Sequence, residues 1–349
     1  MQTEIIKIDR ENIDKEALKH AGEVIKNGGL AAFPTETVYG LGGDAKNPES
    51  SKKIYAAKGR PSDNPLIVHI ADFEDIKKIS KNLPDLAKKL SDAFWPGPLT
   101  MIVEKNDVIP YETTGGLDTV AVRLPSDEVA RELIRASGGF VAAPSANTSG
   151  RPSPTKAWHV IEDMDGKIDV IIDSGRSLLG LESTIVDLTV KDPVILRPGF
   201  ITESMIRKVC EGVSTDPGII AADSNVKPKA PGMKYRHYAP SAPVAVIEGE
   251  EVLVTEKIKS LISDARTKGQ KVGILCATEN ENLYDADFII ALGCKDDEAE
   301  LAGNLFDAMR RFDHEDIDVI YSEGFSREEL GAALMNRLLK AAGHTVIKV

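Results

Sequence analysis

The spacing of apolar residues predicts helices that alternate with short buried strands over the first two thirds of the chain. Residues 14–27 carry Leu18, Ala21 and Ile25 at helical spacing and end at a glycine pair that is typical of a C-terminal cap. Similar helical patterns cover residues 47–58, 73–80, 84–93, 126–137, 155–163 and 202–209. Strand-like runs cover residues 30–33, 66–70, 100–103, 119–123, 140–143, 169–172, 184–188 and 194–197. This alternation predicts an α/β domain over residues 1–211 and leaves its sheet order open.

The pattern stops over residues 212–242, which are rich in Pro, Gly, Ala and Ser and have no sustained period. We expect an extended linker there. Its stretch GMKYRHYAP gathers large aromatic, imidazole and basic side chains in a few residues. The segment either docks on a domain surface or forms a flap over a ligand.

A second alternation follows over residues 243–349 and predicts a smaller α/β domain. Strand-like runs at 244–247, 271–275, 288–292, 319–321 and 346–349 enclose helical patterns at 252–267, 298–312 and 327–341. This spacing favours a small parallel sheet with Rossmann-like winding. The dinucleotide fingerprint G-x-G-x-x-G is missing, so no dinucleotide site is inferred.

Length and charge agree with this division. The 349 residues correspond to about two domains with a linker. Residues 1–240 hold 31 basic and 34 acidic residues, whereas residues 241–349 hold 12 and 21. The acidic last third is therefore unsuited to bind nucleic acid over a wide surface.

The three cysteines lack C-x-x-C spacing and are expected as buried hydrophobes in a reducing compartment. No apolar run reaches the length needed to span a membrane. We therefore expect a cytoplasmic protein.

The densest polar cluster, PTETVYGLGGDA, follows the strand at 30–33 and is expected to form a turn. Thr35, Glu36, Thr37 and Tyr39 stand there beside Gly40, Gly42 and Gly43. Hydroxyls next to glycines suit recognition of a small polar molecule, and an ordinary tight connection explains the composition equally well.

Two cations follow at a predicted helix end. Lys58 and Arg60 flank Gly59 and precede a proline. They either complement the helix dipole or bracket a polyphosphate. Asn64 suits a simple turn, and His69, inside an apolar strand, is by default a core histidine.

Further polar residues stand where other strands end. The segment after the strand at 140–143 carries Ser145, Asn147 and Thr155, which suit an anion cradle, while Ser153 or Thr155 could simply cap the next helix. Arg123 and Arg197 each close a strand and either lie on the surface or bind a ligand. Nucleophile-elbow, Walker and zinc-protease motifs are missing, so the inventory favours a reaction run by positioning and phosphate electrostatics.

These segments resemble one known family. PTETVYGLG, KGRP with NPL, SANTSG, and ESTIVD with RPG occur in the order seen in the threonylcarbamoyl-AMP synthases, which are YrdC-like, and HYAP with a small C-terminal domain matches their two-domain long form. The resemblance implies a twisted, mixed-sheet α/β domain and a nucleotidyltransferase that makes L-threonylcarbamoyl-AMP and pyrophosphate from L-threonine, bicarbonate and ATP, with Mg²⁺ accompanying ATP. The product would pass to the transferase machinery that forms N6-threonylcarbamoyladenosine at position 37 of tRNAs reading ANN codons.

The resemblance also suggests roles for the candidate residues. Lys58 and Arg60 would act in catalysis by neutralising the charge of the ATP phosphates. The expected threonine-binding residues are Thr35, Thr37, His69, Arg123, Ser145 and Ser183. The expected ATP-binding residues are Lys58, Arg60, Asn64, Thr119, Asn147, Thr155, Arg197, Tyr235 and His237, the last two folding over the nucleotide from the linker.

Two other functions are open on the sequence alone. A non-catalytic RNA-binding module is disfavoured by the near-neutral first 240 residues, which also make direct tRNA binding doubtful. Carbamoyl handling in metallocentre maturation predicts acylphosphatase or zinc-finger segments, and the chain has neither.

Overall fold

A computed structural model describes residues 2–216, 218 and 238–349. The chain forms two compact units. The first comprises Met1–Ser149 and Ser153–Tyr235, and the second comprises Gly150–Pro152 and Arg236–Val349. The domain limits expected from the sequence stay predictions, because much of the expected linker at 212–242 lies outside the described residues.

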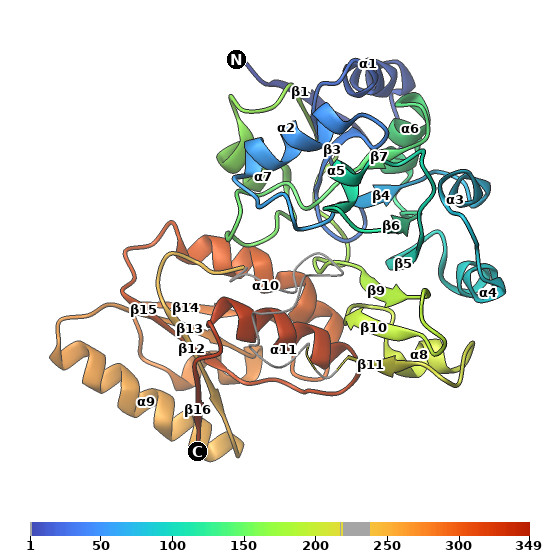
Figure 1. The fold of residues 1–349 in the computed structure, drawn as a ribbon. Coiled ribbons are helices and arrows are strands. Elements are labelled where there is room, and N and C mark those ends of the chain that lie inside the picture. Colours follow the sequence, from blue (N-terminus) through green and yellow to red (C-terminus); the bar gives the residue numbers. More distant parts are fainter. Residues whose placement is uncertain (1, 217, 219–237) are drawn as a thin grey trace. The chain divides into compact units, whose positions relative to one another are not determined.

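The first unit is built on a mixed sheet, as the family resemblance implies (Figure 1). Its eleven strands follow the order β1-β8-β2-β3-β7-β4-β6-β5-β9-β10-β11. The strands are β1 (Glu4–Lys7), β2 (Ala31–Phe33), β3 (Gly40–Asp44), β4 (Ile67–His69), β5 (Leu99–Glu104), β6 (Thr119–Arg123), β7 (Val141–Ala142), β8 (Val170–Asp173), β9 (Thr184–Asp187), β10 (Val194–Arg197) and β11 (Ser214–Thr215). Parallel pairing of β4 with β6 stands beside antiparallel pairing of β5 with β6, so the sheet is mixed.

Helices of the first unit lie close to their expected positions. They are α1 (Lys15–Lys26), α2 (Pro48–Lys58), α3 (Glu74–Ile79), α4 (Asp85–Phe94), α5 (Tyr111–Thr114), α6 (Glu128–Ala136), α7 (Ala157–Met164) and α8 (Glu203–Arg207). The short helix α5 and the strands β1, β3 and β11 are not predicted by the apolar spacing. Apolar residues on the sheet form several buried clusters, one of which includes Leu18 and Ile25 of α1.

The segment expected as one glycine-rich turn is instead partly a strand. Gly40–Asp44 pairs with β2 in antiparallel register, Phe33 opposite Gly40. A Cβ at Gly42 would lie 2.8 Å from Val141 Cγ1 and 2.9 Å from Phe33 Cε1. These glycines therefore allow close packing of neighbouring side chains within the sheet rather than a turn.

The second unit has the predicted parallel sheet and Rossmann-like winding. Its strands are β12 (Val244–Glu248), β13 (Val272–Cys276), β14 (Phe288–Ala291), β15 (Val319–Glu323) and β16 (Val346–Lys348), in the order β14-β13-β15-β12-β16. Its helices are α9 (Glu251–Thr267), α10 (Glu298–Phe312) and α11 (Glu329–Ala341), with the 3₁₀ segment η2 (Thr278–Leu283). Figure 1 shows α9 on one face of the sheet and α10 and α11 on the other.

Two further expectations concern cysteines and the membrane. Cys276 is buried as expected, but Cys294 is exposed and Cys210 is half-buried, so the burial prediction is wrong for these two. None of the helices in the described part of the chain is long and apolar enough to cross a membrane.

Candidate active site

Arg123 at the end of β6 is the centre of a buried polar group. Its Nη1 donates to Thr37 Oγ1 at 2.8 Å, and its Nη2 lies 2.8 Å from Glu36 Oε1. Thr35 Oγ1 lies 2.9 Å from Thr37 Oγ1 and donates to the Val38 carbonyl at 2.7 Å. All four of these residues are at least nine-tenths buried. Arg123 therefore lies in a buried hydrogen-bonded group and not on the surface.

His69 lies beside Arg123 in the parallel register of β4 and β6. Its ring packs edge-on against Phe33, and Nδ1 lies 3.2 Å from the Ile67 carbonyl. Burial, reinforced by the neighbouring Arg123 charge, lowers the pKa of His69 to about 3. His69 is therefore a neutral, weakly basic imidazole at neutral pH.

Lys58 connects helix α2 to the loop after β7. The helix ends there because Gly59 takes a left-handed conformation with φ of 62°. The buried Lys58 ammonium donates to the carbonyls of Ser145 and Asn147, each at 2.5 Å. Ser145 Oγ in turn donates to Asn147 Oδ1 at 2.5 Å. Lys58 thus holds the polar loop in place and does more than complement the helix dipole.

Arg60 and Asn64 form the next group along the chain. The half-buried Arg60 donates through Nε to the Asn64 carbonyl at 3.3 Å and through Nη2 to the Pro65 carbonyl at 3.2 Å. The Asn64 side chain is buried, and its Oδ1 has no hydrogen-bond partner among the described residues.

Ser183 and Arg197 form a third group at β9 and β10. Arg197 donates through Nε to the Ser183 carbonyl at 3.0 Å and through Nη2 to Ser183 Oγ at 3.1 Å. Thr100 Oγ1 lies 2.7 Å from the same hydroxyl. Gly199 permits this turn, because a Cβ there would lie 2.6 Å from the Thr184 nitrogen.

Helix α7 does not use either of its expected caps. Its N-cap is Lys156, which makes no side-chain capping bond. Ser153 Oγ donates instead to Glu182 Oε1 at 2.6 Å, and Thr155 is fully buried with no hydrogen-bond partner for Oγ1 among the described residues. The capping hypothesis is therefore wrong for both residues.

Backbone pairing brings the Arg123, Lys58 and Ser183 groups together. The Ala146 nitrogen donates to the Tyr39 carbonyl, and Gly40 bridges to Ser145, which joins the Arg123 and Lys58 groups. Thr100 stands opposite Arg123 across β5 and β6, which joins the Arg123 and Ser183 groups. Thr119 begins β6, so about 13 Å of strand separates it from Arg123. Tyr235 and His237 lie outside the described residues.

Two residues of the site were given no role by the sequence analysis. Glu36 is the counter-ion of Arg123, and the sequence hint for it was an acid between two threonines directly after a buried strand. Thr100 contacts Ser183, and its signal was a hydroxyl within an apolar strand.

Comparison with known proteins decides the family. A sequence family described as Telomere recombination matches residues 23–199, and one described as Threonylcarbamoyl-AMP synthase, C-terminal domain, matches residues 201–343. The threonylcarbamoyl-AMP synthase of Pyrococcus abyssi is 49% identical over 340 residues, covering 97% of this chain and 98% of the relative. The chain belongs to the threonylcarbamoyl-AMP synthase family.

Other relatives agree over nearly the whole length. The threonylcarbamoyl-AMP synthase of Bacillus subtilis is 47% identical over 332 residues, covering 95% of this chain and 94% of the relative. The crystal structure of Pyrococcus abyssi Sua5 complexed with L-threonine superimposes with a TM-score of 0.95 at 49% identity, covering 99% of this chain and 100% of that chain. Both domains of this family are therefore present in the chain.

Proposed function

We propose that the protein synthesises L-threonylcarbamoyl-AMP from L-threonine, bicarbonate and ATP, with release of pyrophosphate. Family membership and the named activity of near full-length relatives support this function. The threonine complex of the Pyrococcus abyssi protein supports threonine as substrate. The reaction is a nucleotidyl transfer that precedes N6-threonylcarbamoylation of adenosine 37 in tRNA.

Buried polar atoms without hydrogen-bond partners support roles for individual residues. Arg123 Nε, Asn64 Oδ1 and Thr155 Oγ1 are buried without hydrogen-bond partners among the described residues. Buried polar atoms are paired in nearly all native proteins, and pairing by a ligand is one way to satisfy them. All three belong to residues that the family resemblance assigns to substrate binding. Their unused donors and acceptors fit a carboxylate at Arg123 and a nucleotide at Asn64 and Thr155.

The Arg123 group fits the amino-acid substrate. A guanidinium binds a carboxylate through its N–H groups, and Arg123 keeps Nε as a donor for one such bond after contacting Glu36 and Thr37. The hydroxyls of Thr35 and Thr37 lie within hydrogen-bond distance of each other and would orient the polar groups of threonine. The neutral His69 ring adds a polar side chain to the site, and because it is uncharged it does not compete with Arg123 for the threonine carboxylate.

The Lys58 and Arg60 groups fit the phosphates. The threonine amine and bicarbonate give a carbamate with loss of water, and the carbamate oxygen attacks the α-phosphorus in line while the bond to pyrophosphate breaks. The ammonium of Lys58 is held in place by two carbonyls at 2.5 Å, while Arg60 is half-buried beside Asn64. Both cations would neutralise charge that develops on the leaving group.

Magnesium would arrive with ATP. Within the described residues, no cluster of three His, Cys, Asp or Glu side chains could hold a metal ion. Mg²⁺ commonly keeps several waters and binds substrate phosphates, so the ATP phosphates themselves would be its main ligands. When bound, it would offset negative charge on the phosphates.

The product imposes one further requirement. Threonylcarbamoyl-AMP is a mixed anhydride that water destroys, so a dry site favours its survival until transfer to the tRNA-modifying machinery. The family resemblance implies that Tyr235 and His237 contribute to such a cover, and this stays a prediction because both lie outside the described residues.

Pyrophosphate release from ATP tests the function. We expect release only when L-threonine and bicarbonate are both present, accompanied by a product with the mass of threonylcarbamoyl-AMP. Release that ignores either co-substrate would refute the proposal. Steeply salt-dependent tRNA binding without pyrophosphate release would instead favour an RNA-binding module.

A further inference from the structure

The second unit has a cavity at the place where its sheet topology predicts a ligand. Strands β12 and β15 are parallel neighbours. Helix α9 follows β12 and packs on one face, whereas α11 follows β15 and packs with α10 on the other (Figure 1). In open parallel sheets, ligands bind beyond the carboxyl ends of neighbouring strands whose connections leave to opposite faces. The ends of β12 and β15 are such a switch point.

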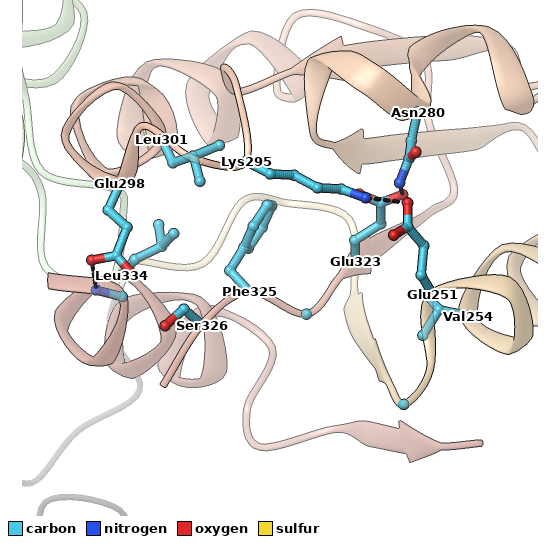
Figure 2. Close-up of a pocket in the computed structure, with 13 residues that line it drawn as sticks. Glu251, Val254, Asn280, Lys295, Glu298, Leu301, Glu323, Phe325, Ser326 and Leu334 are labelled. Atoms are coloured by element: carbon cyan, nitrogen blue, oxygen red, sulfur yellow. Dashed lines mark hydrogen bonds and ion pairs between the residues drawn. The ribbon is translucent and has the colours of Figure 1, made fainter. Parts of the chain in front are cut away.

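The cavity at these strand ends has a volume of about 240 Å³. It is lined by the residues after β12 and β15 and by the first turns of α9, α10 and α11. In Figure 2, Glu298 lies at one end, Glu251 and Glu323 lie at the other, and apolar side chains of Leu301, Leu334 and Phe325 lie between. The lining therefore offers acidic ends and an apolar middle.

The acid at one end is fixed in place. Glu298 Oε2 accepts a hydrogen bond from the Gly331 nitrogen in the first turn of α11 at 2.9 Å. A Cβ at Gly331 would lie 2.8 Å from Glu298 Oε1 and 2.5 Å from the Ser326 carbonyl. The carboxylate already occupies the position that a phosphate would take at this helix N-terminus. A phosphorylated ligand is therefore disfavoured.

The acid at the other end is buried with neutral partners. Glu323 is 4% exposed, and its carboxylate accepts from the Ala277 nitrogen at 2.9 Å, Asn280 Nδ2 at 2.8 Å and Tyr284 Oη at 2.5 Å. These donors satisfy the oxygens without cancelling the charge. Lys295, the one cationic side chain among the described lining residues, is ion-paired with Glu251. Three carboxylates and one ammonium leave two negative charges in the lining.

We propose that this cavity binds a small aliphatic diamine. One ammonium lies at Glu298, the methylene chain lies against Leu301, Leu334 and Phe325, and the second ammonium lies toward Glu323 and Glu251. A ligand with a cation at each end and an apolar body matches both the net charge of the lining and its distribution. This site is separate from the proposed synthase reaction, since all its residues belong to the second unit.

Binding of matched four-carbon probes to the full-length protein tests this. Affinities of 1,4-diaminobutane, n-butylamine and 1,4-butanediol are measured by ligand-observed NMR titration at about 0.1 M salt, where charge interactions persist over about 10 Å. We expect 1,4-diaminobutane to bind at least tenfold more tightly than n-butylamine, with 1,4-butanediol weaker still. Equal affinities for the diamine and the diol, or no diamine binding at about 10 mM, would overturn the proposal.

Two substitutions place the binding in the cavity. Glu298→Gln keeps an acceptor for the Gly331 nitrogen but removes a charge, so diamine affinity should fall about tenfold. Glu256→Gln, exposed on α9 and outside the cavity, is the control and should change it less than twofold. Equal losses in both variants would mean diffuse surface attraction and would overturn the proposal.

Thermal unfolding shows whether Glu298→Gln folds. If it does not, a third variant still tests the proposal. Lys295→Met removes the cation that competes for Glu251, and diamine affinity should rise several-fold. Unchanged or weaker binding in this variant would count against the cavity. Tight binding of AMP that Lys295→Met abolishes would replace the diamine by an anionic ligand.

Discussion

Arg123 Nη2 lies 2.8 Å from Glu36 Oε1, and only 4% and 5% of the two side chains are exposed. The Glu36 carboxylate therefore already balances the charge of the Arg123 guanidinium, the proposed threonine-binding group, before substrate binds. Burying an unpaired guanidinium would be costly, so Glu36 keeps Arg123 in a folded, ready position. A threonine carboxylate then joins or replaces an interaction that already exists.

Removing the Glu36 charge should make stability depend more strongly on threonine. Glu36→Gln leaves Arg123 uncompensated, so the free energy of unfolding should fall by about 3 kcal/mol without substrate. Added L-threonine should stabilise this variant more than the unsubstituted protein, because its carboxylate supplies the missing charge. Denaturant titrations with and without threonine measure both effects. Glu49→Gln, in an exposed ion pair with Lys52, should change neither, and equal threonine stabilisation in all three proteins would contradict this role.

Arg60 should matter for turnover and little for folding. Arg60→Ala removes a half-buried guanidinium whose partners include two carbonyls, so thermal unfolding should change only slightly. The rate of pyrophosphate release should fall at least about 100-fold, since loss of a charged transition-state contact has effects of that order. Lys52→Ala on exposed helix surface should retain full activity. An unfolded Arg60→Ala protein would support a merely structural helix-end role.

Arg197 and Ser183 should act as one unit. Two hydrogen bonds from the guanidinium fix Ser183, so Arg197→Gln and Ser183→Ala should raise the KM for the same substrate, although the family resemblance assigns Ser183 to threonine and Arg197 to ATP. The double variant should lose much less than the sum of the single losses, because each substitution disrupts the same arrangement. Steady-state kinetics with threonine and ATP varied in turn provide the test. Additive losses, or effects on different substrates, would show that the two residues work independently.

His69 should make stability fall under mild acid. The folded pKa of about 3 lies below the usual value of 6.5, so the unfolded chain binds a proton that the folded protein excludes. Stability is therefore greatest above pH 6.5 and declines as pH falls toward 3. Between pH 7 and pH 5 the loss due to His69 is about 2 kcal/mol. Denaturant titrations at both pH values should show this loss in the unsubstituted protein and a smaller one in His69→Asn; identical losses would assign the effect elsewhere.

Apolar spacing was sufficient to predict most helices and strands of both units. It failed where side chains are small or the segment is short, because the hydrophobic pattern then carries little information. Strand β3 is the clearest example, since its glycines are selected by neighbouring side chains such as Phe33 and Val141. Local spacing records nothing of such neighbours.

The site shows the same division between local and long-range information. Residue type and position at strand and helix ends directed attention to Arg123, Arg197 and Lys58, and the family resemblance supplied their expected roles. The sequence alone could not pair Arg123 with Glu36, which lies 87 residues earlier, because sheet register determines that contact. Likewise Thr155 looked like a helix cap until the structure placed Lys156 at that position.

The three residues Gly150–Pro152 belong with the second unit although they stand in the loop between Asn147 and Thr155. Their contacts come from that unit: the Gly150 carbonyl accepts from the Ala239 nitrogen at 3.0 Å, and the Pro152 carbonyl accepts from Arg310 Nη2 at 2.7 Å. The chain therefore contributes to the second unit twice, once through three residues that stand between Asn147 and Thr155. We expect a fragment ending near residue 211 to keep Gly150–Pro152 but to lose the hydrogen bonds from Ala239 and Arg310.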